Sequence, residues 1–336
     1  MIQEMIQALA QFGMLPGGSV SRVAFSKEAS ARLAPYVKRT PVLRAEKLDS
    51  ALGCSVYFKP ECLQLTGSFK IRGATNKILT MTDEERAKGI IASSSGNHAQ
   101  GVAFAAGMLG CKATIVLPAD APLVKVDGTR ALGAEVVLFG HGSIERYKKL
   151  YELVDEKGYS VVHSFNDPML IAGQGTVGYE LMQDLKDVDT VIVPLGGGGL
   201  MAGVAAAIKE TNPNVRVIGA EPAAIARYSE SRKAGKPVVL ELKDTVADGL
   251  MIVNTGTNTY PIIEKYVDEI AAVEDDAIIK ALNEIVFKGK LLVEASAAIG
   301  VGAVLSGKVK VRPDEKVCFI LSGGNIDPAT LSKYIQ

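Results

Sequence analysis

Short apolar runs alternate with longer stretches of helical spacing along most of the chain from about residue 90 onward. The apolar runs are 90–92, 113–117, 135–139, 191–193, 215–218 and 317–321, and the helical patterns are 97–109, 122–132, 143–157, 168–186 and 200–210. Strands that are apolar on both faces are typical of parallel sheets covered by helices on both sides. The pattern therefore predicts an α/β fold.

The 336-residue chain is long enough for two structural units, because domains usually hold about 100–200 residues. Its 37 Lys and Arg residues balance its 37 Asp and Glu residues, and no basic block stands out, which argues against nucleic acid or an anionic membrane as a partner. No apolar run reaches the roughly 18–20 residues of a membrane helix, and the N-terminus lacks the basic region of a signal peptide. We expect a cytoplasmic protein that binds a small neutral or zwitterionic partner.

The cysteines and histidines indicate neither a disulfide framework nor a metal site. Cys54, Cys62, Cys111 and Cys318 lie far apart and form no C-x-x-C pair, as expected for a reducing compartment. The three histidines show no metal-ligand spacing.

Four consecutive glycines, Gly196, Gly197, Gly198 and Gly199, follow an apolar run and precede a small-residue helical pattern. Glycine lets backbone N–H groups converge, and the start of a helix attracts anions, so the tract predicts a phosphate site. The same tract matches the dinucleotide pattern G-x-G-x-x-G/A, with an acidic residue, Glu221, about 20 residues later. A dinucleotide, another phosphorylated ligand and a plain tight turn all remain open.

Lys70 lies among small and apolar neighbours just ahead of a helical pattern at 73–81. A lysine packed beside Phe69 and Ile71 loses solvation, which favours the neutral amine and Schiff-base chemistry. Lys70 is therefore a candidate for binding an aldehyde.

The segment SSSGNH at 93–98 lies between a predicted strand and a predicted helix. Its backbone N–H groups and hydroxyls could bind a carboxylate, although ordinary helix capping by Ser95 or Asn97 would explain the same residues. His98 has no visible partner and suits packing as well as acid–base chemistry. Ser322, Gly323, Gly324 and Asn325 follow the last predicted strand, where open α/β sheets bind ligands.

Taken together, these segments resemble the fold-type II pyridoxal-phosphate enzymes, most closely the threonine/serine dehydratase and serine racemase group. The resemblance covers roughly residues 35–330 and rests on RTP at 39–41, KPE at 59–61, QLTGSFK at 64–70, SSGNHAQG at 94–101, GQGT at 173–176, the glycines at 196–199, ADG at 247–249 and SGGN at 322–325. It implies a tryptophan synthase β-like fold in which two domains each contain an open, mostly parallel sheet flanked by helices. The large cofactor-binding domain would comprise 1–86 and 165–336, and the small domain 87–164.

The resemblance also implies roles for individual residues. Lys70 would bind pyridoxal 5′-phosphate and take the substrate α-proton, Phe69 would flank the coenzyme ring, and Asn97 would hydrogen-bond its 3′-oxygen. Ser322 would face the pyridine nitrogen. The phosphate would lie on Gly196, Gly197, Gly198, Gly199 and Leu200, and the substrate carboxylate on Ser94, Ser95, Gly96, Asn97 and His98.

The implied reaction is β-elimination from L-threonine or L-serine, which yields 2-oxobutanoate or pyruvate plus ammonia. Ser95 matches the serine that exchanges a proton on the opposite face of the coenzyme in the racemases, so a serine or aspartate racemase is an alternative. A β-hydroxyaspartate dehydratase is another, because the residues that read the substrate side chain are not evident. A nicotinamide-dependent dehydrogenase, from the glycine pattern, and a plain small-molecule binding module are more distant possibilities.

Two departures bear on cations and regulation. Racemase-like members often bind a divalent cation through an acid matching Glu221 and an Asp six residues later, where this chain has Arg227. A guanidinium cannot ligate a metal, so we expect no cation site and an Arg227–Glu221 pair instead. The chain ends at Gln336, soon after the Ser322 motif, so the resemblance implies a catabolic or unregulated enzyme rather than a biosynthetic dehydratase with a C-terminal regulatory domain. Two-fold dimers are the commonest soluble oligomers, so we expect a homodimer.

Overall fold

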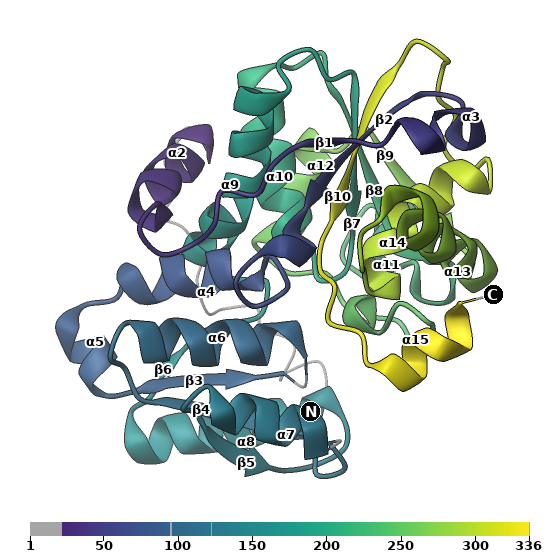
Figure 1. Ribbon diagram of the computed structural model, residues 1–336. Coiled ribbons are helices and arrows are strands. Elements are labelled where there is room, and N and C mark those ends of the chain that lie inside the picture. The colour runs from purple at the N-terminus through teal and green to yellow at the C-terminus, as the bar shows by residue number, and fades with distance from the viewer. Residues whose placement is uncertain (1–21, 95, 122, 336) are drawn as a thin grey trace.

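The computed structural model describes residues 22–94, 96–121 and 123–335 and contains two separate β-sheets, each flanked by helices (Figure 1). The larger sheet has the strand order β1-β2-β10-β7-β8-β9, and the smaller has the order β5-β4-β3-β6. Only β1 runs antiparallel to its neighbour. The predicted α/β fold with two open, mostly parallel sheets is confirmed.

The larger sheet carries an apolar core on each face. Its strands are β1 (Leu43–Arg44), β2 (Ser55–Pro60), β7 (Thr190–Pro194), β8 (Arg216–Pro222), β9 (Glu269–Val273) and β10 (Lys316–Leu321). The helices around it are α2 (Arg22–Leu33), α3 (Asp49–Leu52), α4 (Lys70–Leu79), α9 (Pro168–Asp184), α10 (Gly199–Thr211), α11 (Arg227–Ala234), α12 (Thr259–Tyr266), α13 (Asp275–Glu284), α14 (Ala295–Leu305) and α15 (Pro328–Tyr334). Helices α9 and α10 pack closely because glycines meet, and a Cβ added to Gly203 would lie 2.4 Å from the Ile171 carbonyl oxygen.

The smaller sheet lies at the lower end of the molecule in Figure 1. It consists of β3 (Ile90–Ser93), β4 (Ala113–Leu117), β5 (Glu135–Leu138) and β6 (Ser160–Val161), with α5 (Asp83–Ala87), α6 (Asn97–Met108), α7 (Leu123–Ala131) and α8 (Ser143–Lys157) around it. Two further apolar clusters cover its faces. The limits of the two domains, at 86/87 and 164/165, stay a prediction.

Most predicted elements are present, with differences at their ends. Helix α4 begins at Lys70 rather than Gly73, so Lys70 is the first residue of a helix. Strand β8 continues past the predicted 218 to Pro222, because the small residues after it are still buried and paired with β9. The sequence pattern missed the short β6 and also β2, which polar residues begin and nearly end, and β9, which begins with a glutamate.

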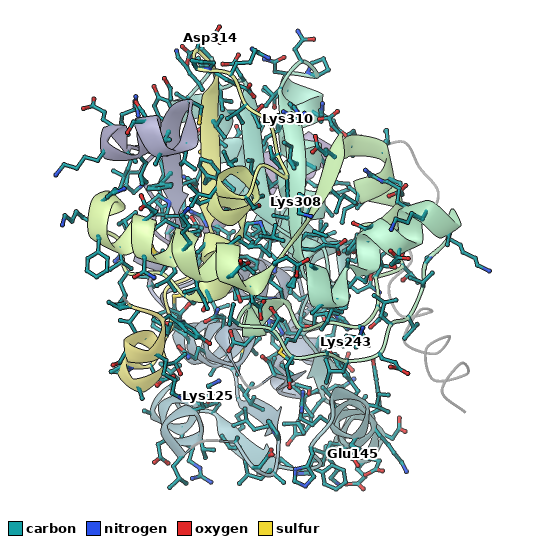
Figure 2. All side chains as sticks on the ribbon, turned by 90° about the vertical axis from the view of Figure 1, so that its right-hand side faces the viewer. Lys125, Glu145, Lys243, Lys308, Lys310 and Asp314 are labelled. Atoms are coloured by element: carbon teal, nitrogen blue, oxygen red, sulfur yellow. The ribbon has the colours of Figure 1, made fainter. Side chains whose placement is uncertain are left out.

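Figure 2 shows Lys125 and Glu145 on the part that holds the smaller sheet, and Lys308, Lys310 and Asp314 toward the far end of the larger part. None of the helices in the described part of the chain combines the length and apolarity needed to cross a membrane.

Candidate active site

Three neighbouring parallel strands of the larger sheet end at the same edge and supply most of the candidate site. Strand β10 pairs with β2 on one side and with β7 on the other. Beyond its carboxyl end lies Ser322, beyond that of β7 lie the four glycines, and the chain after β2 leads to Lys70. Segments far apart in the sequence therefore meet because the carboxyl ends of parallel strands share one edge.

The smaller sheet supplies the other wall through the segment after β3. Ser94 follows the strand, and its Oγ accepts a hydrogen bond from the Gly96 N–H at 3.2 Å. Gly96 is the N-cap of α6, so Asn97 and His98 open that helix and their N–H groups have no acceptor within it. Ser95 lies outside the described residues.

The Lys70 amine is held at the start of α4. Its Nζ donates to the Ser164 carbonyl oxygen at 2.7 Å and lies 5.2 Å from the centroid of the Phe69 ring. Burial lowers the pKa of Lys70 to about 8, although the nearby Glu294 carboxylate opposes that shift. A neutral, nucleophilic amine is therefore accessible near physiological pH.

A buried charge cluster fixes the helix that Lys70 begins. The Arg72 guanidinium donates to Glu61 at 2.7 Å and to Glu180 at 2.6 Å, and the Lys59 amine donates to Glu180 at 2.7 Å. Two positive and two negative side chains thus compensate one another inside the protein, as buried charges require. The cluster ties α4 to β2 and α9 and leaves Lys70 a defined position.

The glycine loop is bonded along its carbonyl side. The carbonyl oxygens of Leu195 and Gly196 accept from Arg227, and that of Gly197 accepts from the hydroxyls of Tyr228 and Thr259. In a trans peptide the carbonyl and the following N–H point in opposite directions. Each of the carbonyls of residues 195–197 is followed by the N–H of the next residue. The N–H groups of residues 196–198 therefore point away from Arg227 and Tyr228.

Those N–H groups are what an anion needs. Within the described part of the chain, the backbone N–H groups of Gly196, Gly197 and Gly198 have no hydrogen-bond partner. Gly198 has φ of 93° and is the N-cap of α10, so the loop leads directly into a helix N-terminus. The buried amide of Gln174, which also lacks a partner among the described residues, lies against Gly199. Unbonded donors in this arrangement fit the phosphate of pyridoxal phosphate.

Side chains fill the space where larger residues would project from the loop. A Cβ on Gly197 would lie 2.3 Å from the Phe165 ring, and one on Gly198 would lie 2.1 Å from the Tyr228 hydroxyl. Phe165 directly follows Ser164, the residue that accepts from Lys70. This segment therefore joins the glycine loop to the Lys70 amine.

Asn97 is held by two residues of the large sheet's loops. Its Nδ2 lies 2.9 Å from both carboxylate oxygens of Glu294, and its Oδ1 accepts from Asn325 at 2.7 Å. These bonds orient the amide, so Asn97 is not the capping residue that its place in the sequence allowed. Burial raises the pKa of Glu294 to about 7, with Asp248 adding to that shift and Lys70 opposing it.

Two other predicted residues have defined surroundings. The carbonyl oxygen of Ser322 accepts from the Phe69 N–H at 3.1 Å, which places Ser322 next to the loop that carries Lys70. The His98 Nε2 lies 2.9 Å from the Val162 carbonyl oxygen, and burial lowers the pKa of His98 to about 3. The His98 ring is thus bonded to the backbone after β6, and its backbone N–H is the donor left for a carboxylate. Leu200 is buried in the first turn of α10.

The Glu221 carboxylate is bonded to backbone N–H groups. Its two oxygens accept from the Tyr228 N–H at 3.0 Å and the Ser229 N–H at 2.7 Å, so the carboxylate caps α11. The expected Arg227–Glu221 pair is wrong in detail, because the Arg227 guanidinium donates to backbone carbonyls and makes no hydrogen bond to Glu221. The described residues contain no group of three His, Cys, Asp or Glu side chains arranged for a metal ion.

The sequence analysis missed several residues that shape the site. Glu294 was visible only as a lone acid in the apolar stretch 291–298, a pattern that marks a buried charge. Ser164, Phe165 and Tyr228 carry no signal, because they act through a backbone carbonyl, a ring face and a single hydroxyl.

The chain matches known proteins over nearly its whole length. The family model described as "Pyridoxal-phosphate dependent enzyme" matches residues 33–323. The L-threonine ammonia-lyase of Geobacter sulfurreducens is 45% identical over 92% of this chain and 77% of its own, and the serine racemase of Oryza sativa is 42% identical over 91% of both. The structure of maize serine racemase superposes with a TM-score of 0.89 at 39% identity, covering 93% of this chain and 95% of that one.

Proposed function

Because the chain belongs to the family of pyridoxal-phosphate-dependent enzymes, we propose that it is an ammonia-lyase acting on L-threonine or L-serine. The products are 2-oxobutanoate from threonine and pyruvate from serine, with ammonia in both cases. The observation that carries this proposal is the Lys70 amine, whose pKa is lowered to about 8 and which the segment 164–165 joins to the unbonded N–H groups of the glycine loop.

The chain's own residues divide the work between binding and proton transfer. The N–H groups of residues 196–198 would hold the phosphate, and Lys70 would bind the coenzyme aldehyde. When bound, pyridoxal phosphate supplies a sink for the electrons of the substrate's Cα–H bond. Ser94 and the N–H groups that open α6 would hold the substrate carboxylate. The Lys70 amine, released from the coenzyme aldehyde when the substrate amine replaces it, would take the Cα proton.

Ser322 favours elimination over a long-lived carbanion. We propose that it would face the ring nitrogen with a neutral hydroxyl, which would not hold a proton on that nitrogen as a carboxylate would. After removal of the Cα proton, the β-hydroxyl group would leave as water, with a proton from the coenzyme phosphate. Asn97 contributes an amide whose orientation Glu294 and Asn325 fix before substrate arrives.

The test is incubation of the purified yellow protein with L-threonine and L-serine, followed by assays of 2-oxo acid and ammonia. We expect equimolar amounts of both products. The proposal fails if neither product forms from either amino acid while pyridoxal phosphate is bound.

A second candidate activity is racemisation of serine, which the similarity to serine racemases supports. Ser95 is the residue proposed to exchange a proton opposite Lys70. Chiral chromatography of residual serine tests it: a Ser95→Ala variant should lose enantiomer exchange and keep elimination. Equal loss of both activities would contradict the special role of Ser95.

A further inference from the structure

Arg227 is a fully buried guanidinium whose four hydrogen bonds all go to backbone carbonyls. Its Nη1 donates to Leu195 at 3.1 Å and Gly196 at 2.7 Å, and its Nη2 donates to Ile225 at 2.9 Å and Leu250 at 2.8 Å. Four carbonyl oxygens from three separate segments therefore converge on one positive charge. Such a set of oxygens is what a hard divalent cation prefers, but here the guanidinium fills the position.

The residues present do not fit a divalent cation. Both carboxylate oxygens of Glu221, six residues before Arg227, accept from the Tyr228 and Ser229 N–H groups. Arg227 itself stays positively charged although burial lowers its pKa, and a charged guanidinium repels a metal ion. The four carbonyl oxygens and the two Glu221 oxygens thus each accept from a donor that the chain supplies.

The position of Arg227 behind the glycine loop has a consequence for the other side of that loop. Because Nη1 fixes the carbonyls of residues 195 and 196, the N–H groups of Gly196 and Gly197 must point the opposite way. The two peptide dipoles then have their negative ends at the guanidinium and their positive ends at the proposed phosphate position. A cation, aligned dipoles and an anion in this order stabilise one another.

We propose that Arg227 is an internal cation that positions the glycine loop for the coenzyme phosphate, so that this enzyme needs no divalent cation. Arg227 acts through the loop and is a positioning residue. The proposal rests on the proposed binding of pyridoxal phosphate at residues 196–198.

The first test uses the wild-type holoenzyme. Metal analysis of the purified protein should find no stoichiometric divalent cation, and coenzyme affinity should be the same in EDTA, Mg²⁺ and Ca²⁺ to within about twofold. A bound metal whose removal weakens coenzyme binding would overturn the proposal without any variant.

The second test compares pyridoxal phosphate with pyridoxal, which lacks the phosphate. Arg227→Met should weaken binding of pyridoxal phosphate by about tenfold to a hundredfold, because two loop carbonyls lose a charged donor. Binding of pyridoxal should change by less than about twofold. Equal weakening of both ligands would mean general damage and would contradict a role through the phosphate.

The controls separate charge from folding. Arg232→Met removes a half-buried guanidinium from the same helix, where it pairs with Glu264 at 3.1 Å, and should leave both affinities unchanged. Arg227→Lys keeps the charge and three donors, so its affinity for pyridoxal phosphate should lie between those of wild type and Arg227→Met. It replaces Arg227→Met in the test if that variant does not fold. Affinity for pyridoxal phosphate in Arg227→Lys no better than in Arg227→Met would refute the internal cation. If the wild type binds no pyridoxal phosphate, the proposed function fails, whereas normal binding by wild type and Arg227→Met refutes this inference alone.

Discussion

The two ends of the candidate site treat their polar groups in opposite ways. At the glycine loop, the carbonyls of 195–197 are bonded by Arg227, Tyr228 and Thr259, all fully buried. At the amine end, burial moves the pKa of Lys70 to about 8 and that of Glu294 to about 7. The glycine loop is fixed by donors whose protonation does not change near neutral pH. The amine end contains two groups, Lys70 and Glu294, that gain or lose a proton near neutral pH.

This contrast separates binding from chemistry. Substitutions at the loop should change coenzyme affinity, because they alter the shape of a bonded backbone. Substitutions at the amine end should change rates and pH dependence, because they alter groups that titrate in the working range.

Replacement of Lys70 is the strongest test of the amine end. Lys70→Ala should lower the rate of 2-oxo acid formation at least about a thousandfold, because the base and the attachment point disappear together. The phosphate end should still bind the coenzyme non-covalently, as equilibrium dialysis can measure. Lys88→Ala, which removes a half-exposed lysine paired with Glu84, is the matched control. A Lys70→Ala enzyme that keeps a tenth of the wild-type rate would refute the role of this amine.

Replacement of Gly198 tests the loop. Gly198→Ala combines a φ of 93° with a Cβ only 2.1 Å from the Tyr228 hydroxyl, so the loop must move. We expect about a hundredfold weaker binding of pyridoxal phosphate, measured by absorbance titration, with the folded apoenzyme retained.

Gly235→Ala provides the comparison for Gly198→Ala. Gly235 also has a positive φ, of 64°, but an added Cβ would meet nothing within 4 Å. Gly235→Ala should lower the free energy of unfolding by about 1 kcal/mol and leave coenzyme affinity unchanged. If both alanine variants bound the coenzyme equally well, close packing against Tyr228 would not matter.

The sequence was sufficient for the fold class, and it singled out residues in short, contiguous motifs whose roles stay predictions. The glycines and Ser322 follow the predicted apolar strands β7 and β10, and the rule that the carboxyl ends of parallel strands meet at one sheet edge brings them together. The pattern missed β2, so the same rule did not place Lys70 at this edge. The apolar pattern also located α6, α8 and α9 to within a few residues.

What the sequence could not supply depends on pairing across long separations. Glu294 and Asn97 are 197 residues apart in the sequence. Nothing in either segment indicates that the Asn97 amide donates to the Glu294 carboxylate. Arg227 was expected to pair with Glu221, its neighbour in sequence, yet backbone carbonyls from three segments take its donors. Backbone acceptors are present at every residue, so no sequence pattern marks the ones a buried donor selects.

Glu294 tests the titrating character of the amine end. Its pKa is raised from 4.5 to about 7, so its contribution to stability is present below about pH 4.5 and is lost as pH rises through 7. In Glu294→Gln, the apoenzyme should keep that contribution and be more stable than wild type by about 3 kcal/mol at pH 8, with little difference at pH 4.5. Urea unfolding across this range measures it.

Several charged and polar groups around Glu294 affect its pKa, so a control variant at another glutamate is needed. Asp248 adds to the raised pKa, and Asn97, Lys70 and Lys125 act against it. Glu241→Gln, at an exposed position, should leave the pH dependence of unfolding unchanged. A parallel pair of curves for wild type and Glu294→Gln would show that the carboxyl does not titrate between pH 4.5 and 7.

The smallest expected effect comes from Tyr228, and its size tests whether the loop is held by redundant donors. The Gly197 carbonyl accepts from both Tyr228 and Thr259 at 3.0 Å, so Tyr228→Phe leaves one donor in place. Coenzyme affinity should fall only about threefold, the net worth of one hydrogen bond. Tyr228→Phe combined with Thr259→Val leaves that buried carbonyl with no donor and should cost more than the two single changes added together. Strict additivity would mean that the two hydroxyls act independently and that neither compensates for loss of the other.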